Sequence, residues 1–231
     1  MKSPSRQLTL ELPLEPSFGR EDFLVSPTNA AAFDMFERWP DWPGRSLLLL
    51  GPTGSGKSHL GAIWAERAGA RILAASELGR ADVPTLAASG ALLIEDADRA
   101  GAAPGGLAEA EFFHLLNLMR ESGGYLAVTA RAWPDAWGLA TRDLLSRLRL
   151  APAVEIGEPD DALVRAVLVK LFMDRQLTVD ASVVEYLALR IERSLAAARS
   201  IVLTLDREAL AAGRAVTRPM ASEVLRRLDL A

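Results

Sequence analysis

The sequence contains no cysteine, only two histidines, and no apolar run long enough to cross a bilayer. The lack of cysteine excludes disulfides and thiolate metal sites and favours a cytoplasmic protein. A membrane-spanning helix needs roughly 20 consecutive apolar residues. The segment Met1 to Leu14 also lacks the apolar core and small-residue cleavage site of a signal peptide. The sequence therefore predicts a chain without a membrane partner.

An excess of positive charge is also missing. The chain has 26 basic and 30 acidic residues, mixed along its length, with a formal net charge of −4. Proteins that hold duplex DNA usually neutralise its phosphates with a basic face. We therefore expect no direct sequence-specific DNA binding by this chain. Half of its residues are hydrophobic, which is enough to bury a substantial core.

The residue pattern divides the chain into three zones. Residues 1–19 contain three prolines and predict a flexible arm. Residues 20–158 alternate short apolar runs with helical patterns, which predicts an α/β domain with a five-stranded parallel sheet. Residues 159–231 contain only amphipathic helical patterns, which predicts a small all-α domain.

The boundaries of the predicted elements follow from where the apolar runs begin and end. The predicted strands are Ser46–Leu50, Arg71–Ala75, Ala91–Glu95, Tyr125–Thr129 and Ala153–Ile156. Within the α/β zone the clearest helical patterns are Lys57–Ala68 and Leu107–Glu121. The C-terminal zone predicts helices over Asp160–Asp174, Asp180–Ile191, Ser194–Gly213 and Arg218–Leu228.

A complete P-loop follows the first strand and precedes a helix. It reads Gly51, Pro52, Thr53, Gly54, Ser55, Gly56, Lys57 and Ser58. The glycines let backbone N–H groups turn toward phosphate oxygens, and the following helix adds its positive N-terminal end. Lys57 would neutralise the β- and γ-phosphates, and the Ser58 hydroxyl would bind Mg²⁺. This strand–loop–helix context predicts binding of ADP or ATP with Mg²⁺.

Two further strands end in polar residues suited to phosphate chemistry. Glu95 and Asp96 end the third strand, where Glu95 would face the metal and Asp96 would polarise a water. Because this order of the two acids is unusual for the element, the division of their roles stays open. Thr129 ends the fourth strand, and its hydroxyl would reach a γ-phosphate or the attacking water.

Arginines in two later segments are candidates for phosphate contacts. Arg142 and Arg147 lie near the edge of the α/β domain, where an arginine can enter the site of a neighbouring molecule; Arg147 is the favoured candidate. Arg193 and Arg199 lie near the start of a lid helix, and either can reach back toward bound phosphates. An ordinary surface arginine is the alternative in each case.

Taken together, these motifs resemble the AAA+ domain of the bacterial replication initiator DnaA. The resemblance rests on Gly-Lys-Ser-His-Leu in the P-loop, Leu-Leu-Ile-Glu-Asp, Val-Thr and Leu-Ser-Arg-Leu. It implies an AAA+ core followed by a helical lid, Arg147 as an arginine finger and Arg193 as the lid arginine. The segment from Phe18 to Asn29 is similar to the stretch that borders the adenine pocket. Asn29 and His59, the residue after the P-loop, therefore join the expected nucleotide-binding residues.

The chain stops at the lid, without the helix-turn-helix domain of an initiator, and so resembles the Hda/HdaA family of regulatory inactivators of DnaA. The arm sequence Gln7-Leu8-Thr9-Leu10-Glu11-Leu12 is similar to the hexapeptide with which such proteins hold the DNA polymerase III sliding clamp. Gln7 would fix the register by hydrogen bonds while Leu8, Leu10 and Leu12 enter an apolar groove. Glu11 stands where proline is common.

This resemblance implies a negative regulator of chromosomal replication initiation. The nucleotide-bound protein, loaded on the clamp, would stimulate ATP hydrolysis by DnaA. Lys57, Glu95 and Asp96 are compatible with weak hydrolysis by the chain itself, and homo-oligomer formation stays open. An alternative is a helicase-loading ATPase resembling the DnaC/IstB group, with single-strand binding. A metabolic P-loop kinase is less favoured because no acceptor-substrate motif is evident.

Overall fold

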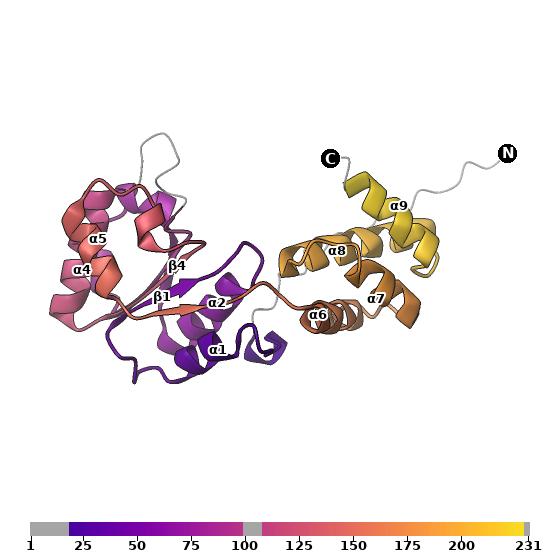
Figure 1. The fold of residues 1–231 in the computed structure, drawn as a ribbon, viewed down its shortest axis with the longest axis horizontal. Coiled ribbons are helices and arrows are strands. Elements are labelled where there is room, and N and C mark those ends of the chain that lie inside the picture. The colour runs from indigo at the N-terminus through magenta and orange to yellow at the C-terminus, as the bar shows by residue number, and fades with distance from the viewer. Residues whose placement is uncertain (1–18, 99–107, 229–231) are drawn as a thin grey trace.

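The computed structural model describes residues 19–98 and 108–228. These residues form an α/β lobe and an all-helical lobe that meet side by side (Figure 1). The predicted clamp-binding residues Gln7, Leu8, Leu10 and Leu12 lie outside the described residues, as does Leu107.

A five-stranded parallel sheet forms the centre of the α/β lobe. Its strands are β1 (Ser46–Leu50), β2 (Arg71–Ala74), β3 (Ala91–Glu95), β4 (Tyr125–Ala130) and β5 (Ala153–Glu155). They are arranged in the order β2-β3-β4-β1-β5, and every pair is parallel. The predicted α/β class and strand number are confirmed. Three predicted strands end one residue away from the observed end.

Helices cover both faces of this sheet (Figure 1). On one face lie α1 (Ala30–Glu37) and α2 (Lys57–Ala68); on the other lie α3 (Val83–Ala87), α4 (Glu109–Ser122) and α5 (Arg142–Leu150). Alternate residues of β1 explain the two layers, because successive side chains of a strand point to opposite faces. Leu47 and Leu49 pack with α1 and α2, whereas Leu48 and Leu50 pack on the opposite side. All four are buried, as expected of a central parallel strand.

The helical lobe has a core of its own. It contains α6 (Asp161–Asp174), α7 (Ala181–Ala188), α8 (Leu195–Ala212) and α9 (Arg218–Leu228). Three of these helices begin where a polar side chain accepts a backbone N–H: Asp160 from Leu163, Asp180 from Ser182, and Ser194 from Ala197. Their apolar faces meet in one cluster, in which the Phe172 side chain is 1% exposed.

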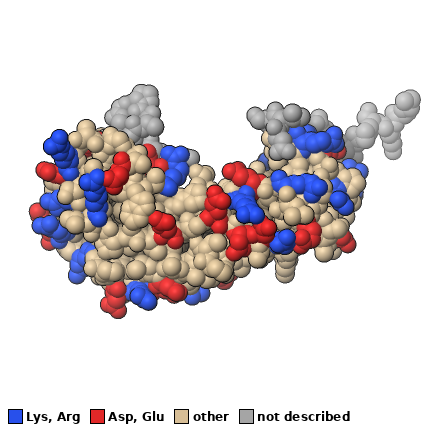
Figure 2. Space-filling model, viewed as in Figure 1, with Lys and Arg blue, Asp and Glu red and all other residues tan. Residues whose placement is uncertain are grey.

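On the face of the molecule drawn in Figure 2, both lobes carry positively and negatively charged side chains. Within residues 19–98 and 108–228, no helix is long and apolar enough to cross a membrane.

Two polar contacts join the lobes beside the P-loop. The Leu195 backbone N–H, at the start of α8, donates to the Gly54 carbonyl oxygen at 2.8 Å. The Lys170 ammonium on α6 lies 2.6 Å from a carboxylate oxygen of Asp22, in the short 3-10 helix Arg20–Asp22. The helical lobe is therefore placed over the sheet edge where the P-loop begins.

Candidate functional site

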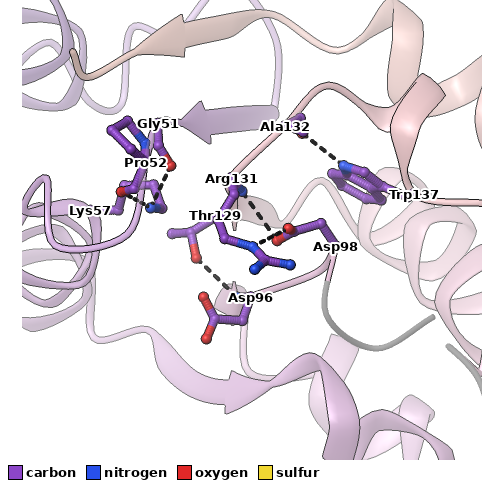
Figure 3. A network of polar contacts seen from close by, with 9 residues as sticks. All are labelled: Gly51, Pro52, Lys57, Asp96, Asp98, Thr129, Arg131, Ala132 and Trp137. Atoms are coloured by element: carbon purple, nitrogen blue, oxygen red, sulfur yellow. Dashed lines mark hydrogen bonds and ion pairs between the residues drawn. The ribbon is translucent and has the colours of Figure 1, made fainter. Parts of the chain in front are cut away.

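The P-loop connects the buried strand β1 to the N-terminus of α2. Gly51 has φ 153°, and a Cβ added there would lie 2.3 Å from the Ile156 carbonyl oxygen, so only glycine fits. Helix α2 begins at Lys57, as predicted, so the positive N-terminal end of the helix lies at the loop. The Lys57 ammonium donates to the carbonyl oxygens of Gly51 at 2.7 Å and Pro52 at 2.8 Å (Figure 3).

A cavity of about 260 Å³ opens in front of this loop, and we call it the phosphate cavity. On the P-loop side it is lined by Thr53, Gly54, Gly56, Lys57, Ser58 and His59. The rest of its lining comes from Asp96 and Arg131, which follow β3 and β4, and from Leu195, Ala196 and Arg199 of α8. Most of the predicted P-loop contacts therefore share one cavity. Ser55 does not line it, because this residue is 1% exposed and lies inside the loop.

The two predicted acids occupy different positions. Asp96 lines the phosphate cavity, whereas one carboxylate oxygen of Glu95 is buried and has no hydrogen-bond partner among the described residues. Asp96 has φ 54°, an unusual backbone conformation that aspartate tolerates better than most residues. Strained conformations of this kind are frequent at functional sites.

The structure places Thr129, which we expect to reach a γ-phosphate or the attacking water, against the Asp96 backbone. The Thr129 residue is 1% exposed and does not line the phosphate cavity. Its hydroxyl oxygen accepts a hydrogen bond from the Asp96 backbone N–H at 3.1 Å (Figure 3). Thr129 therefore supports the unusual Asp96 backbone, whereas Arg131, two residues later, lines the cavity.

Arg131 is a cavity residue that the sequence analysis missed. It follows the end of β4 and lines the phosphate cavity opposite Lys57. Asp98 holds it through two bonds, from the Arg131 backbone N–H at 3.1 Å and from its Nε at 2.6 Å (Figure 3). Arg131 could have been found from its position just after β4, a parallel strand that pairs with β1. The carboxyl ends of such strands lie side by side, next to the P-loop.

A second cavity, of about 410 Å³, adjoins the first between the lobes, and we call it the base cavity. Charged residues line it together with apolar side chains of both lobes. The charged residues include Asp22, Lys170 and Arg175, and the apolar ones are Phe23, Leu24, Leu163, Val167, Leu171 and Leu195. His59, Leu195 and Arg199 line both cavities.

Asn29 lines the base cavity, but its amide is engaged within its own segment. Its oxygen accepts from the Ser26 backbone N–H at 2.8 Å, and its nitrogen donates to the Leu24 carbonyl at 3.0 Å. The residue is 1% exposed. Asn29 therefore shapes the cavity wall through the backbone of residues 24–26.

His59 links the base cavity to the phosphate cavity. Its ring lies edge-on to Phe23, with 5.3 Å between the ring centroids, and Nε2 lies 3.1 Å from the Gly19 carbonyl oxygen. Burial lowers the pKa of His59 below its ordinary value, and the nearby Arg199 charge lowers it further, despite the opposing effects of the Gly19 carbonyl and Asp22. The neutral ring is therefore favoured.

The structure brings Arg199 to the cavities and leaves Arg193 outside them. Arg193 precedes the N-terminal residue of α8, its side chain is 62% exposed, and it forms an ion pair with Asp161 at 3.0 Å. Arg199 lies on the same helical face as Leu195, four residues away, and this face meets the cleft. The prediction that Arg193 is the lid arginine is therefore not supported by its position. Burial lowers the pKa of Arg199, and the Arg175 charge adds to the effect.

Arg147 lies on α5, outside its own phosphate cavity. Its guanidinium carbon is 5.0 Å from the centroid of the Phe113 ring. With Arg45 and Arg120 it lines a groove beside the beginning of β1. Because the strands are parallel, all of them start at one end of the sheet and finish at the other, where the P-loop follows β1. Arg147 lies at the end of the sheet where the strands start, away from the P-loop. Arg142, at the start of α5, is exposed and does not line this groove.

Comparisons with known proteins agree with this architecture. Residues 161–225 match the family described as Hda, lid domain. Comparison with curated proteins gave no sequence match. Domain III of the Thermotoga maritima replication initiation protein DnaA superposes with a TM-score of 0.77 at 20% identity, covering 93% of this chain and 98% of that one.

Two structures with bound nucleotide also resemble the chain. AMPPCP-bound DnaA from Aquifex aeolicus gives a TM-score of 0.69 at 18% identity, covering 84% of this chain and 67% of that chain. The FIGL-1 AAA domain in complex with ADP gives a TM-score of 0.60 at 18% identity, covering 80% of this chain and 72% of that chain. Together, these likenesses confirm the predicted AAA+ fold with a helical lid, and the lid match confirms the predicted resemblance to Hda.

Proposed function

We propose that this chain binds an adenine nucleotide and regulates DnaA, because residues 161–225 match the Hda lid domain and the fold resembles that of DnaA domain III. The observation that carries the nucleotide proposal is the pair of adjoining cavities. One, which we propose for the base, is lined by apolar side chains such as Phe23 and Leu163 together with charged ones such as Asp22 and Lys170. The other is formed by a P-loop with Lys57, Arg131 and Arg199 around it. The two together fit a molecule that is aromatic at one end and anionic at the other.

Mg²⁺ fits the acidic side of the phosphate cavity. In P-loop sites the ion is bound by phosphates, waters and one or two protein oxygens. Ser58 and Asp96 line the cavity, and the buried Glu95 oxygen without a partner suits a hydrated cation nearby. Within the described residues no group of three or more acidic or histidine side chains forms a metal site by itself. When bound, the ion would neutralise phosphate charge.

Lys57 provides the direct test of nucleotide binding. Lys57→Ala should weaken ADP and ATP binding alike, by roughly ten- to a hundredfold, the loss expected for hydrogen bonds to a charged group. The measurement is isothermal titration calorimetry on the full chain. Arg71→Ala, on the exposed edge strand β2, is the matched control and should leave both affinities unchanged. Absence of nucleotide binding by the wild-type chain would contradict the proposal.

The regulatory role rests on Arg147 and on the lid. An arginine that enters a partner's nucleotide site stabilises the charge of the transferring phosphoryl group. Arg147 lies away from its own phosphate cavity, which suits action on another molecule. We propose that this molecule is DnaA with ATP bound, that the nucleotide held by this chain shapes it for docking, and that the relevant hydrolysis takes place in DnaA.

The N-terminal arm supplies the second partner in this proposal. Gln7, Leu8, Leu10 and Leu12 would bind the DNA polymerase III sliding clamp, which would concentrate the protein where replication has begun. The match to an Hda lid favours this role over helicase loading.

A reconstitution with the clamp on DNA and DnaA–ATP tests the arm. Deletion of residues 1–12 should abolish clamp binding and clamp-dependent stimulation of ATP hydrolysis. It should leave nucleotide affinity unchanged, because the two cavities are lined by residues 21 and beyond. Undiminished clamp binding by the truncated chain would contradict the assignment of the arm.

A further inference from the structure

The groove that contains Arg147 has an apolar floor. Its volume is about 260 Å³, and we call it the α4–α5 groove. Leu48, Val128 and Leu148 line its buried part, and each is 1% exposed. Leu150, the last residue of α5, lines the groove as well and is 82% exposed. A single exposed leucine is ordinary on a protein surface, but this one continues the apolar floor of a groove out to the solvent.

The charges that line the α4–α5 groove are all positive. Arg45, Arg120 and Arg147 line it, and none of the described residues in its lining is acidic. In the described part of the chain, no carboxylate forms an ion pair with any of these three arginines, whereas Arg149 on the same helix α5 pairs with Asp135. The chain as a whole has a formal net charge of −4, so the groove is a local excess of positive charge. Because like charges in one groove repel, an anionic partner would relieve the repulsion.

The three guanidinium groups keep hydrogen-bond donors for such a partner. Arg147 lies over the Phe113 ring, with its guanidinium carbon 5.0 Å from the ring centroid. Arg45 lies 4.9 Å from the centroid of the Tyr125 ring and donates one bond to the Gly123 carbonyl oxygen at 2.6 Å. The Arg120 side chain has no hydrogen bond or ion pair with the residues that the structure describes. A guanidinium has five N–H donors and binds carboxylates in a planar, bidentate arrangement.

The combination of charge and apolar surface indicates the chemistry of the partner. A nucleic-acid backbone would use the arginines but leave the apolar floor and Leu150 in water. A protein segment with carboxylates on both sides of an apolar side chain matches both features. Arginine beside a buried apolar centre is also the composition typical of the residues that dominate protein–protein binding.

We propose that the α4–α5 groove binds an acidic segment of DnaA, with an apolar side chain of that segment against Leu150 and its carboxylates on Arg45 and Arg120. The proposal rests on the proposed regulation of DnaA and adds the surface that holds this partner. Since Arg147 lines the same groove, a segment bound there keeps DnaA beside Arg147. The groove then sets the affinity for DnaA, while Arg147 sets the rate of hydrolysis in the complex.

ATP hydrolysis by DnaA, followed at increasing concentrations of the full chain with the clamp on DNA, tests this division. Arg120→Glu and Leu150→Ser should each raise the concentration for half-maximal stimulation by about tenfold or more. The hydrolysis rate at saturation should stay that of the wild type. Added salt should raise the half-stimulating concentration of the wild type toward that of Arg120→Glu, because exposed charges are screened.

Arg80→Glu is the matched control, because Arg80 is exposed and does not line the groove. It should leave the half-stimulating concentration unchanged. Circular dichroism and nucleotide calorimetry check that each variant is folded and binds nucleotide.

The proposal requires both the charge and the apolar contact. An unchanged half-stimulating concentration in either variant, or a loss of the saturating rate in its place, overturns it. Weaker self-association of the variants in sedimentation, with undiminished stimulation of DnaA, also overturns it and assigns the groove to a second copy of this chain. Stimulation by the wild type that is lost in Arg147→Ala would leave the proposed function standing in these cases. A wild-type chain that does not stimulate DnaA overturns both.

Discussion

The Leu195 backbone N–H, at the first residue of α8, donates to the Gly54 carbonyl oxygen in the P-loop at 2.8 Å. The lid is therefore in direct contact with the loop proposed to bind phosphate. Gly54 has φ 75°, and an added Cβ would lie 1.9 Å from the Ser194 hydroxyl oxygen. The P-loop backbone is thus bonded to the start of α8 without an intervening side chain.

Gly54→Ala should consequently disturb both the loop and the docking of the lid. The left-handed backbone costs a residue with a Cβ about 1–2 kcal/mol, and the close contact with Ser194 adds to this. To relieve this strain the free loop should leave its phosphate-binding conformation, and recovering that conformation on binding costs a similar free energy. We therefore expect nucleotide affinity to fall by at least about fivefold, as measured by calorimetry.

Gly69→Ala is the matched control for this substitution. Gly69 has φ 61° at the end of α2, but an added Cβ meets nothing within 4 Å. This variant should lose stability from backbone strain alone and keep its nucleotide affinity. Equal nucleotide affinity in Gly54→Ala and the wild type would show that the contact with the lid does not matter for binding.

His59 predicts a pH dependence of stability. Its pKa in the folded chain lies below the ordinary value of 6.5, chiefly because of burial. As the pH falls below that value, the unfolded chain binds a proton before the folded chain does. The free energy of unfolding therefore decreases toward acid pH and is retained at pH values above the ordinary pKa. The free energy of unfolding by urea, measured at about pH 5.5 and pH 7.5, should differ less between the two pH values in His59→Gln than in the wild type. The same difference in both proteins would contradict the assignment.

The end of α6 offers a test of backbone strain in the lid. Gln176 has φ 56°, a conformation typical of glycine, and its N–H donates to Met173 while Leu177 donates to Phe172. These two bonds are those of a helix end that usually contains glycine. Gln176→Gly should therefore raise the free energy of unfolding by about 0.5–1 kcal/mol. Gln176→Ala should give no such gain, and a gain of equal size there would contradict the explanation.

The sequence contains strong local signals for the P-loop and for the helix starts. Helix α2 was predicted from Lys57 to Ala68 as observed, because its glycines and apolar spacing define both ends. Asp160, Asp180 and Ser194 were predicted near helix starts and form caps there. These features depend on a few neighbouring residues, which is why they could be predicted.

The cavity residues from later strands and helices could not be predicted in the same way. Arg131 belongs to no motif, and its place in the phosphate cavity depends on β4 lying next to β1 in the sheet. Choosing between Arg193 and Arg199 required knowing which face of α8 meets the P-loop, because the predicted helix start at Ser194 does not by itself place either side chain in the cavity. The position of Thr129 depended on which face of β4 it occupies. Each of these is a tertiary relationship between segments distant in the sequence.

We propose that Arg147 acts on the nucleotide of a DnaA molecule. The rate of ATP hydrolysis by DnaA, in the presence of this protein and the clamp on DNA, measures this action directly. We predict that Arg147→Ala reduces that rate to the rate of DnaA alone, while Arg142→Ala, an exposed arginine on the same helix, retains stimulation. Both variants should keep the nucleotide affinity of the wild type. Full stimulation by a folded, nucleotide-bound Arg147→Ala variant would contradict the claim.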